Sequence, residues 1–134
     1  MSFQPGKASK ARAERRQRRH PRYRIEFPVT LSLLSEGEHR RLNAHCRDLS
    51  VAGIGMLIAA ELNLGEVAAL SFALPGSPQP WELRAVLRHR RGYHYGFEFL
   101  TIKPDDATFL AAFLPKLERE DYDFGETPSP RSPQ

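Results

Sequence analysis

Arginines are concentrated in one short stretch near the start of the chain, RRQRRHPRYR at residues 15–24. Within it, Arg18 and Arg22 have the spacing R-x-x-x-R, and Arg19 lies between them. An arginine guanidinium is a planar fork of donors that pairs bidentately with phosphates and with the O6 and N7 edge of guanine. Composition alone allows a solvated charge run, an arm for nucleic acid, or half of a site for one ligand.

A second polar motif, D-x-S-x-x-G, is formed by Asp48, Ser50 and Gly53. By itself this is an ordinary turn sequence. Asp and Ser side chains bond to nearby backbone, and Gly allows unusual dihedral angles or a close approach of another chain segment. Whether the two motifs form one site therefore depends on the strands that position them.

Apolar residues alternate with polar ones over most of residues 23–99, which predicts half-buried strands. The six predicted strands cover residues 23–33, 42–47, 54–58, 70–74, 83–88 and 93–99. The first contains Pro28, which cannot donate to a ladder, so we expect an open edge there. Six short strands with turns between them favour a small antiparallel barrel, because closure removes exposed edges.

The period changes to helical spacing at the C-terminal end, where Phe109, Phe113 and Leu117 recur. Pro104 suits a first helical position, and Pro115 should end or kink the helix near Leu114. One amphipathic helix must cover the barrel to bury its apolar stripe. The predicted fold class is all-β with one C-terminal helix, a six-stranded antiparallel β-barrel.

The charge of +4 is unevenly distributed, since residues 1–24 carry a net +8 and residues 25–134 a net −4. The partner of the basic end should be anionic: a nucleic acid, a membrane surface, a nucleotide or the chain's own acidic tail. We predict a disordered basic arm at 1–14, a folded domain at 15–118 and a disordered acidic, then Pro/Ser-rich tail at 119–134. Neither a signal peptide nor a membrane span is evident, which favours a cytoplasmic protein.

The two motifs, in this order and strand context, resemble the PilZ domain family of bacterial cyclic di-GMP receptors. The resemblance covers residues 15–118 and includes RYRIEFPV after the arginines and YGFEFL in the last strand. It implies a six-stranded antiparallel barrel with a C-terminal helix, the same architecture that the periodicity predicts. It also implies a non-enzymatic receptor or adaptor, whose basic arm closes over the nucleotide and alters a surface offered to an unknown protein partner.

The resemblance also implies a set of cyclic di-GMP-binding residues. Arg18, Arg19 and Arg22 would hold phosphates and guanine. Asp48 and Ser50 would read a guanine edge, since the Asp48 carboxylate can accept from guanine N1–H and N2–H. Gly53 would let the backbone pass close by or adopt a positive φ. The fifth strand often completes the pocket, and here its candidates are two arginines. The full set is Arg18, Arg19, Arg22, Asp48, Ser50, Gly53, Arg88 and Arg90.

Some features stay open or take a structural interpretation. Certain family members have a tryptophan at the fifth-strand position, but here the single tryptophan, Trp81, is assigned to packing. Gln17 does not decide whether one ligand or a stacked pair binds. The five histidines show no metal-ligand spacing, and Cys46 alternates with apolar residues as a buried side chain would.

Two other functions compete with the receptor. One is a degenerate PilZ-like protein-interaction module without nucleotide binding, and the other is single-stranded nucleic-acid binding by the barrel and its basic arm. An enzyme is disfavoured, because no nucleophile–base set, metal site or Gly-rich phosphate loop is present in the sequence.

Overall fold

The computed structural model describes residues 20–35 and 37–120. The predicted basic arm at 1–14, Arg18, Arg19 and all but the first two residues of the predicted tail lie outside these ranges. The predictions made for those segments therefore remain predictions.

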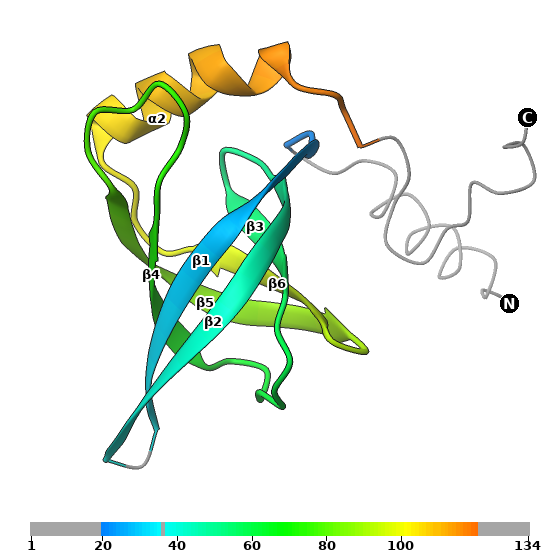
Figure 1. Cartoon of the computed structure of the whole chain (residues 1–134), viewed down its shortest axis with the longest axis vertical. Helices are drawn as coiled ribbons and strands as arrows, with labels where there is room; N and C mark the ends of the chain where they lie inside the picture. The colour runs from blue at the N-terminus through cyan, green and yellow to red at the C-terminus, as the bar shows by residue number, and fades with distance from the viewer. Residues whose placement is uncertain (1–19, 36, 121–134) are drawn as a thin grey trace, which may run out of the picture.

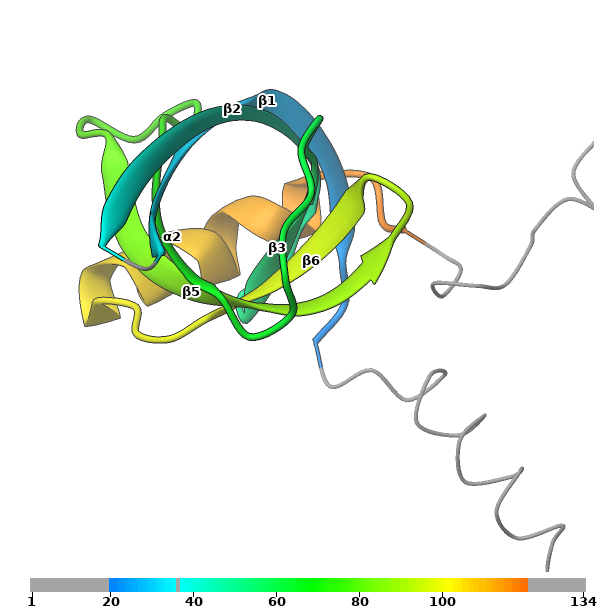
Figure 2. The same ribbon diagram turned by 90° about the horizontal axis from the view of Figure 1, so that it is seen from below.

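Six antiparallel strands close into a barrel in the order β1-β2-β3-β6-β5-β4, as the ring of ribbons in Figure 2 shows. The strands are β1 (Tyr23–Ser35), β2 (Glu38–Leu49), β3 (Gly53–Leu57), β4 (Val67–Phe72), β5 (Trp81–Arg91) and β6 (His94–Phe99). The predicted fold class is confirmed. The fourth strand begins and ends earlier than predicted, because Val67 already pairs with Val86 of β5 and the pairing stops at Phe72.

The interior of the barrel is filled by the alternate apolar side chains that the sequence pattern selects. Leu31, Ile54 and Leu87 are fully buried on three different strands. Each such side chain contributes about 1.5–3 kcal/mol relative to full exposure. The buried Tyr95 hydroxyl is satisfied, since it donates to the Ala60 carbonyl at 2.7 Å and accepts from the Leu62 amide at 3.2 Å.

Pro28 has the open edge expected of it. On one side Pro28 pairs with His45 of β2. On the other side β4 pairs only with residues 30–33 of β1, so the ladder with β4 begins beyond Pro28. The ladder with β4 is therefore not interrupted by the missing N–H of the proline.

The helix α2 (Pro104–Phe113) lies across one end of the barrel, as Figure 1 shows. It passes into a short 3-10 helix, η1 (Leu114–Lys116), at the point where Pro115 was predicted to end it. Leu110 and Leu114 are buried against the barrel. Trp81 has the predicted packing role, because its ring lies 5.8 Å from that of Phe109 and 5.9 Å from that of Phe72.

Candidate functional site

Asp48 is the charged residue at the centre of the site, and a strand irregularity determines where its side chain lies. Strict alternation after Ala44 and Cys46 would send Asp48 into the core. Instead the register between β2 and β3 shifts between Cys46 and Asp48, and Leu49 takes the inward position. A bulge of this kind re-aims the side chains that follow it. The carboxylate therefore lies on the outer face of the barrel, although Asp48 is only 7% exposed.

Two side chains contact this carboxylate. Arg22 Nη1 donates to Asp48 Oδ1 at 2.9 Å, and His94 Nε2 lies 3.7 Å from Oδ2. Burial alone raises the pKa of Asp48, but the polar contact with His94 and the positive charge of Arg22 outweigh it and hold that pKa below its usual value. The ion pair joins one residue of each sequence motif.

Gly55 and Gly96 lie between Asp48 and His89 on neighbouring strands. Asp48 pairs with Gly55, Gly55 with Gly96, and Gly96 with His89, so the four residues form one row across β2, β3, β6 and β5. A Cβ on Gly55 would lie 2.6 Å from Asp48 Oδ2, and a Cβ on Gly96 would lie 2.3 Å from the His89 ring. The missing side chains therefore leave the space that the carboxylate and the imidazole occupy.

His89 reaches this outer face through a second irregularity, since the register between β5 and β6 shifts between Leu87 and His89. His89 stands at one end of the row of four residues, and Asp48 stands at the other end. Each polar residue follows a bulge on an outer strand of the row and lies over the glycine on the adjacent inner strand.

The loop between β2 and β3 is held by its own motif. The Ser50 hydroxyl accepts from the amides of Ala52 and Gly53, both at 3.0 Å, and the Ser50 amide donates to the Gly53 carbonyl at 2.9 Å. A Cβ on Gly53 would lie 2.3 Å from the Phe97 carbonyl oxygen of β6. Of the two roles predicted for this glycine, close approach is the one observed, because its φ is not positive.

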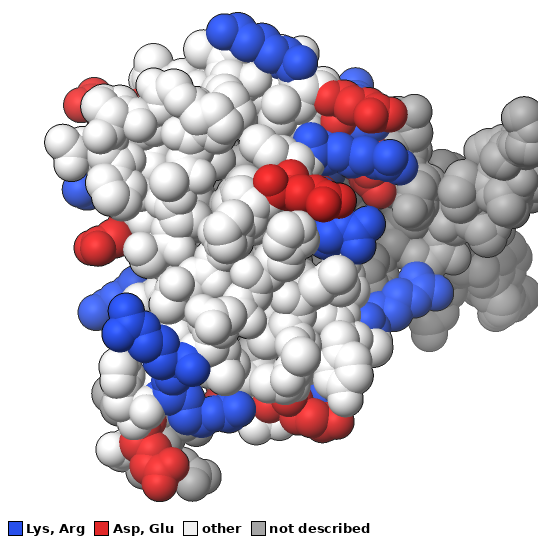
Figure 3. Space-filling model, viewed as in Figure 1, with Lys and Arg blue, Asp and Glu red and all other residues white. Residues whose placement is uncertain are grey.

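A pocket of about 240 Å³ opens beside this loop. Its lining includes four of the eight predicted site residues, namely Arg22, Ser50, Gly53 and Arg88. It also includes residues that the sequence did not single out, namely His20, Ala52, His89, Gly96, Phe97 and Glu98. Asp48 does not line the pocket, but it is paired with Arg22, which does. Figure 3 shows blue and red groups beside one another along the edge next to the grey residues and a largely uncharged centre.

The two fifth-strand arginines differ in position. Arg88 lines the pocket, and its Nε donates to Glu98 Oε1 at 2.7 Å. Arg90 does not line it. The Arg90 guanidinium lies 5.1 Å from the ring centre of Tyr95, its Nε donates to the Gly92 carbonyl, and its Nη1 is 3.5 Å from Glu61. The structure therefore brings Arg88, but not Arg90, to the other predicted residues.

Comparison with known proteins identifies the family. The family model for the PilZ domain matches residues 16–115, which is most of the chain. The chain belongs to the PilZ domain family. The comparison with curated protein sequences found no match.

Solved structures of PilZ domains share the fold. The PilZ domain of YcgR from Escherichia coli, solved with c-di-GMP, is 22% identical with a TM-score of 0.56, covering 75% of this chain and 91% of that chain. The PilZ domain of CeSA from a cellulose-synthesizing bacterium is 15% identical, with a TM-score of 0.54 and coverage of 71% and 95%. The inhibitor of motility MotI/DgrA of Bacillus subtilis is 19% identical with a TM-score of 0.57. The match covers 75% of this chain but only 50% of MotI/DgrA.

Sequence reasoning missed the histidines of this PilZ domain. His20 and His89 line the pocket and His94 contacts Asp48, whereas the spacing of the histidines in the sequence indicated no binding role. One signal was available: Gly55 and Gly96 stand among apolar residues of two strands, where glycine indicates a close approach. The bulges that turn Asp48 and His89 outward leave no comparable trace in the hydrophobic pattern.

Within residues 20–35 and 37–120, no helix is long and apolar enough to cross a membrane. The same ranges contain no group of three or more His, Cys, Asp or Glu side chains that could hold a metal ion.

Proposed function

We propose that this PilZ domain is a non-enzymatic receptor for cyclic di-GMP that passes its signal to a protein partner in the cytoplasm. The observation that carries the proposal is the ion pair between Arg22 and Asp48 at the pocket that Arg88 and His89 complete. It joins the R-x-x-x-R and D-x-S-x-x-G motifs on one outer face of the barrel. The PilZ domain of YcgR, with the same fold, was solved with c-di-GMP.

The residues around the pocket supply what a guanine dinucleotide requires. The Arg22 fork pairs with a phosphate or with guanine O6 and N7, and the Asp48 carboxylate accepts from guanine N1–H and N2–H. Because the pKa of Asp48 is lowered, this carboxylate is ionised at neutral pH and acts only as an acceptor. The His89 ring occupies the space over Gly96 and lines the pocket, so it supplies an imidazole on which a purine can stack.

Ligand binding requires two existing ion pairs to rearrange. Arg22 must share Asp48 with the guanine or leave it for a phosphate. Arg88 must exchange Glu98 for the ligand, and this pair is more than half exposed on both sides, so its loss costs at most about 1 kcal/mol.

Ser50 shapes the loop, since its hydroxyl is already bonded to the backbone of its own turn.

The arginines ahead of Arg22 complete the proposal. We expect Arg18 and Arg19 to hold phosphates and guanine and the arm to close over the nucleotide. Closure would change the surface available to a partner, and charge-assisted contacts in the complex would offset the entropy of ordering.

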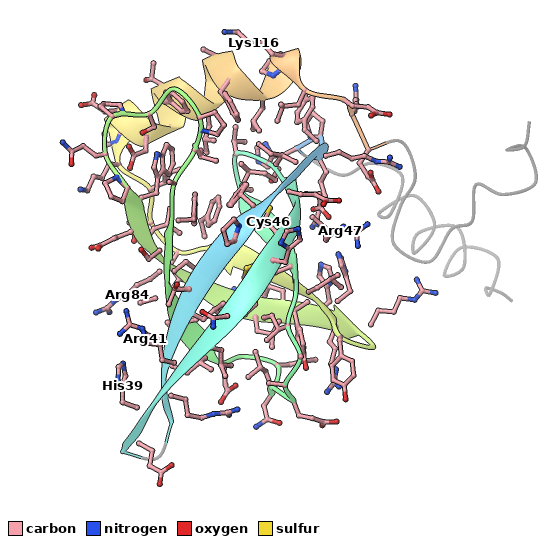
Figure 4. All side chains as sticks on the ribbon, viewed as in Figure 1. His39, Arg41, Cys46, Arg47, Arg84 and Lys116 are labelled. Atoms are coloured by element: carbon pink, nitrogen blue, oxygen red, sulfur yellow. The ribbon has the colours of Figure 1, made fainter. Side chains whose placement is uncertain are left out.

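Titration calorimetry with cyclic di-GMP tests the proposal. Arg22→Ala should weaken binding by about 10- to 100-fold, because a hydrogen bond to a charged group contributes about 1.5–3 kcal/mol. Arg41→Ala is the matched control. Figure 4 labels this arginine on β2, and it is exposed and does not line the pocket. Absence of heat with wild-type protein would favour the interaction module without nucleotide binding.

Single-stranded DNA serves as the competing ligand in the same experiment. Binding that falls steeply with salt and does not need Asp48 would favour the nucleic-acid function, because a carboxylate repels a phosphate backbone. The receptor requires the opposite pattern, with dependence on Asp48 that persists at moderate salt.

A further inference from the structure

The chain segment after η1 returns to the start of β1 and pairs with it. Arg119 forms an isolated antiparallel bridge with Tyr23. The Arg24 amide donates to the Glu118 carbonyl and the Glu120 amide donates to the Arg22 carbonyl, both at 2.8 Å. Residues 118–120 therefore form a short ribbon with residues 22–24, and we call residues 118–120 the C-terminal clamp.

The clamp occupies an edge that the barrel leaves open. Tyr23 pairs with Leu49 of β2 on its other side, and β4 reaches only residues 30–33 of β1. An uncovered edge is a row of unsatisfied backbone groups, and a short added strand satisfies them. The chain reaches this edge because η1 ends at Lys116 and Leu117 is extended, with φ −96° and ψ 167°.

The clamp acts directly on the ligand-binding arginine. Tyr23 is the first residue of β1 that pairs with β2, so Arg22 lies just outside that ladder. The Arg22 backbone is held by the Glu120 amide, while the Arg22 side chain reaches Asp48. The clamp thus fixes the main chain from which the guanidinium extends.

The ion pair between Arg24 and Glu120 bears on which arginine pairs with Asp48. In the register of β1 and β2, the residue directly opposite Asp48 is Arg24, not Arg22. Directly opposite residues are close enough for their side chains to pair. However, Arg24 Nε lies 2.7 Å from Glu120 Oε1, and Asp48 is left to Arg22.

We propose that the C-terminal clamp is a positioning element for the cyclic di-GMP site. It fixes the Arg22 backbone and holds the Arg24 side chain on Glu120, so that Arg22 presents its guanidinium to Asp48 and to the ligand. Glu120 is a positioning residue, since it acts through Arg24 and through the Arg22 main chain. This inference rests on the proposed function.

A matched pair of truncations tests the clamp by titration calorimetry with cyclic di-GMP. The chain ending at residue 120 keeps the clamp and should bind like the full chain. The chain ending at residue 117 loses the two backbone hydrogen bonds to Arg22 and Arg24, and its affinity should fall by about tenfold or more. Both end in a new carboxylate, which controls for that charge. Equal affinities for the two truncations, at equal melting temperatures, would overturn the inference.

Point variants keep the test decisive if the shorter chain unfolds. Glu120→Gln should weaken cyclic di-GMP binding by about two- to fivefold with an unchanged melting temperature. The conservative variant Glu120→Asp keeps a carboxylate for Arg24 and should retain more affinity than Glu120→Gln, which a role of the side chain in packing alone would not explain. Wild-type affinity in Glu120→Gln would contradict the clamp. Absence of binding by the full wild-type chain would instead contradict the receptor function itself.

Discussion

Gly53→Ala offers a quantitative test of how the site loop is packed against the barrel. The added Cβ would lie 2.3 Å from the Phe97 carbonyl oxygen, and ordinary contacts begin at 3.4 Å. The strands β3 and β6 must therefore separate by about 1 Å at this point. The obstacle is backbone, so it cannot move aside by rotating a side chain.

The expected cost follows from that obstruction. Overpacking of this kind destabilises a domain by about 1–3 kcal/mol. For a domain of this size we expect the melting temperature of Gly53→Ala to fall by roughly 4–15 °C. Thermal unfolding followed by circular dichroism measures the shift.

Gly96→Ala is the comparison variant for this measurement. Its Cβ would meet the His89 imidazole rather than backbone, and this side chain can turn away. We therefore expect Gly53→Ala to unfold at the lower temperature. A Gly53→Ala protein that melts at the wild-type temperature, or above Gly96→Ala, would refute the close approach inferred here.

Three further predictions concern the site and the barrel interior beside it. Gly96→Ala should weaken cyclic di-GMP binding by about tenfold while leaving most of the stability, because it displaces the proposed stacking face of His89; calorimetry with unchanged affinity would remove His89 from the site. The folded-state pKa of Asp48 is lowered, so its ion pair stabilises the fold above the unfolded pKa of about 3.9, and this stabilisation disappears as the pH falls through the folded value. Acid titration of stability should accordingly show wild type losing its advantage over Asp48→Asn as the pH drops, whereas a constant difference would contradict the assignment. Burial, reinforced by the nearby Asp48 charge, raises the pKa of Cys46, so its thiol should react with a thiol reagent only after unfolding, and rapid labelling of the native protein would show the interior to be more open than described.

The sequence was sufficient for the barrel because the apolar period marks the inward residues. Figure 4 shows this for neighbouring residues of β2, Cys46 and Arg47, of which the first is fully buried and the second exposed. The same alternation fails at Asp48 and His89, because each follows a bulge that reverses which side chains point inward. A hydrophobic period contains no signal for one inserted residue.

Other parts of the site depend on contacts between distant polar residues. Arg90 was a candidate for the pocket by its neighbourhood in sequence, but its guanidinium lies over Tyr95 and beside Glu61. Glu120 was assigned to the acidic tail, yet its amide donates to Arg22, just before β1, and its carboxylate pairs with Arg24 of β1. Pairings of this kind arise from the closed barrel and cannot be predicted from local composition.

The measurement that tests the central claim most directly is a calorimetric titration of the full chain with cyclic di-GMP, repeated with Asp48→Ala. The receptor function predicts saturable heat with the wild-type protein and its loss, or at least a tenfold weakening, when the carboxylate is removed. Absence of heat with wild type, or equal affinity in both proteins, would contradict the claim that Arg22 and Asp48 form a guanine dinucleotide site.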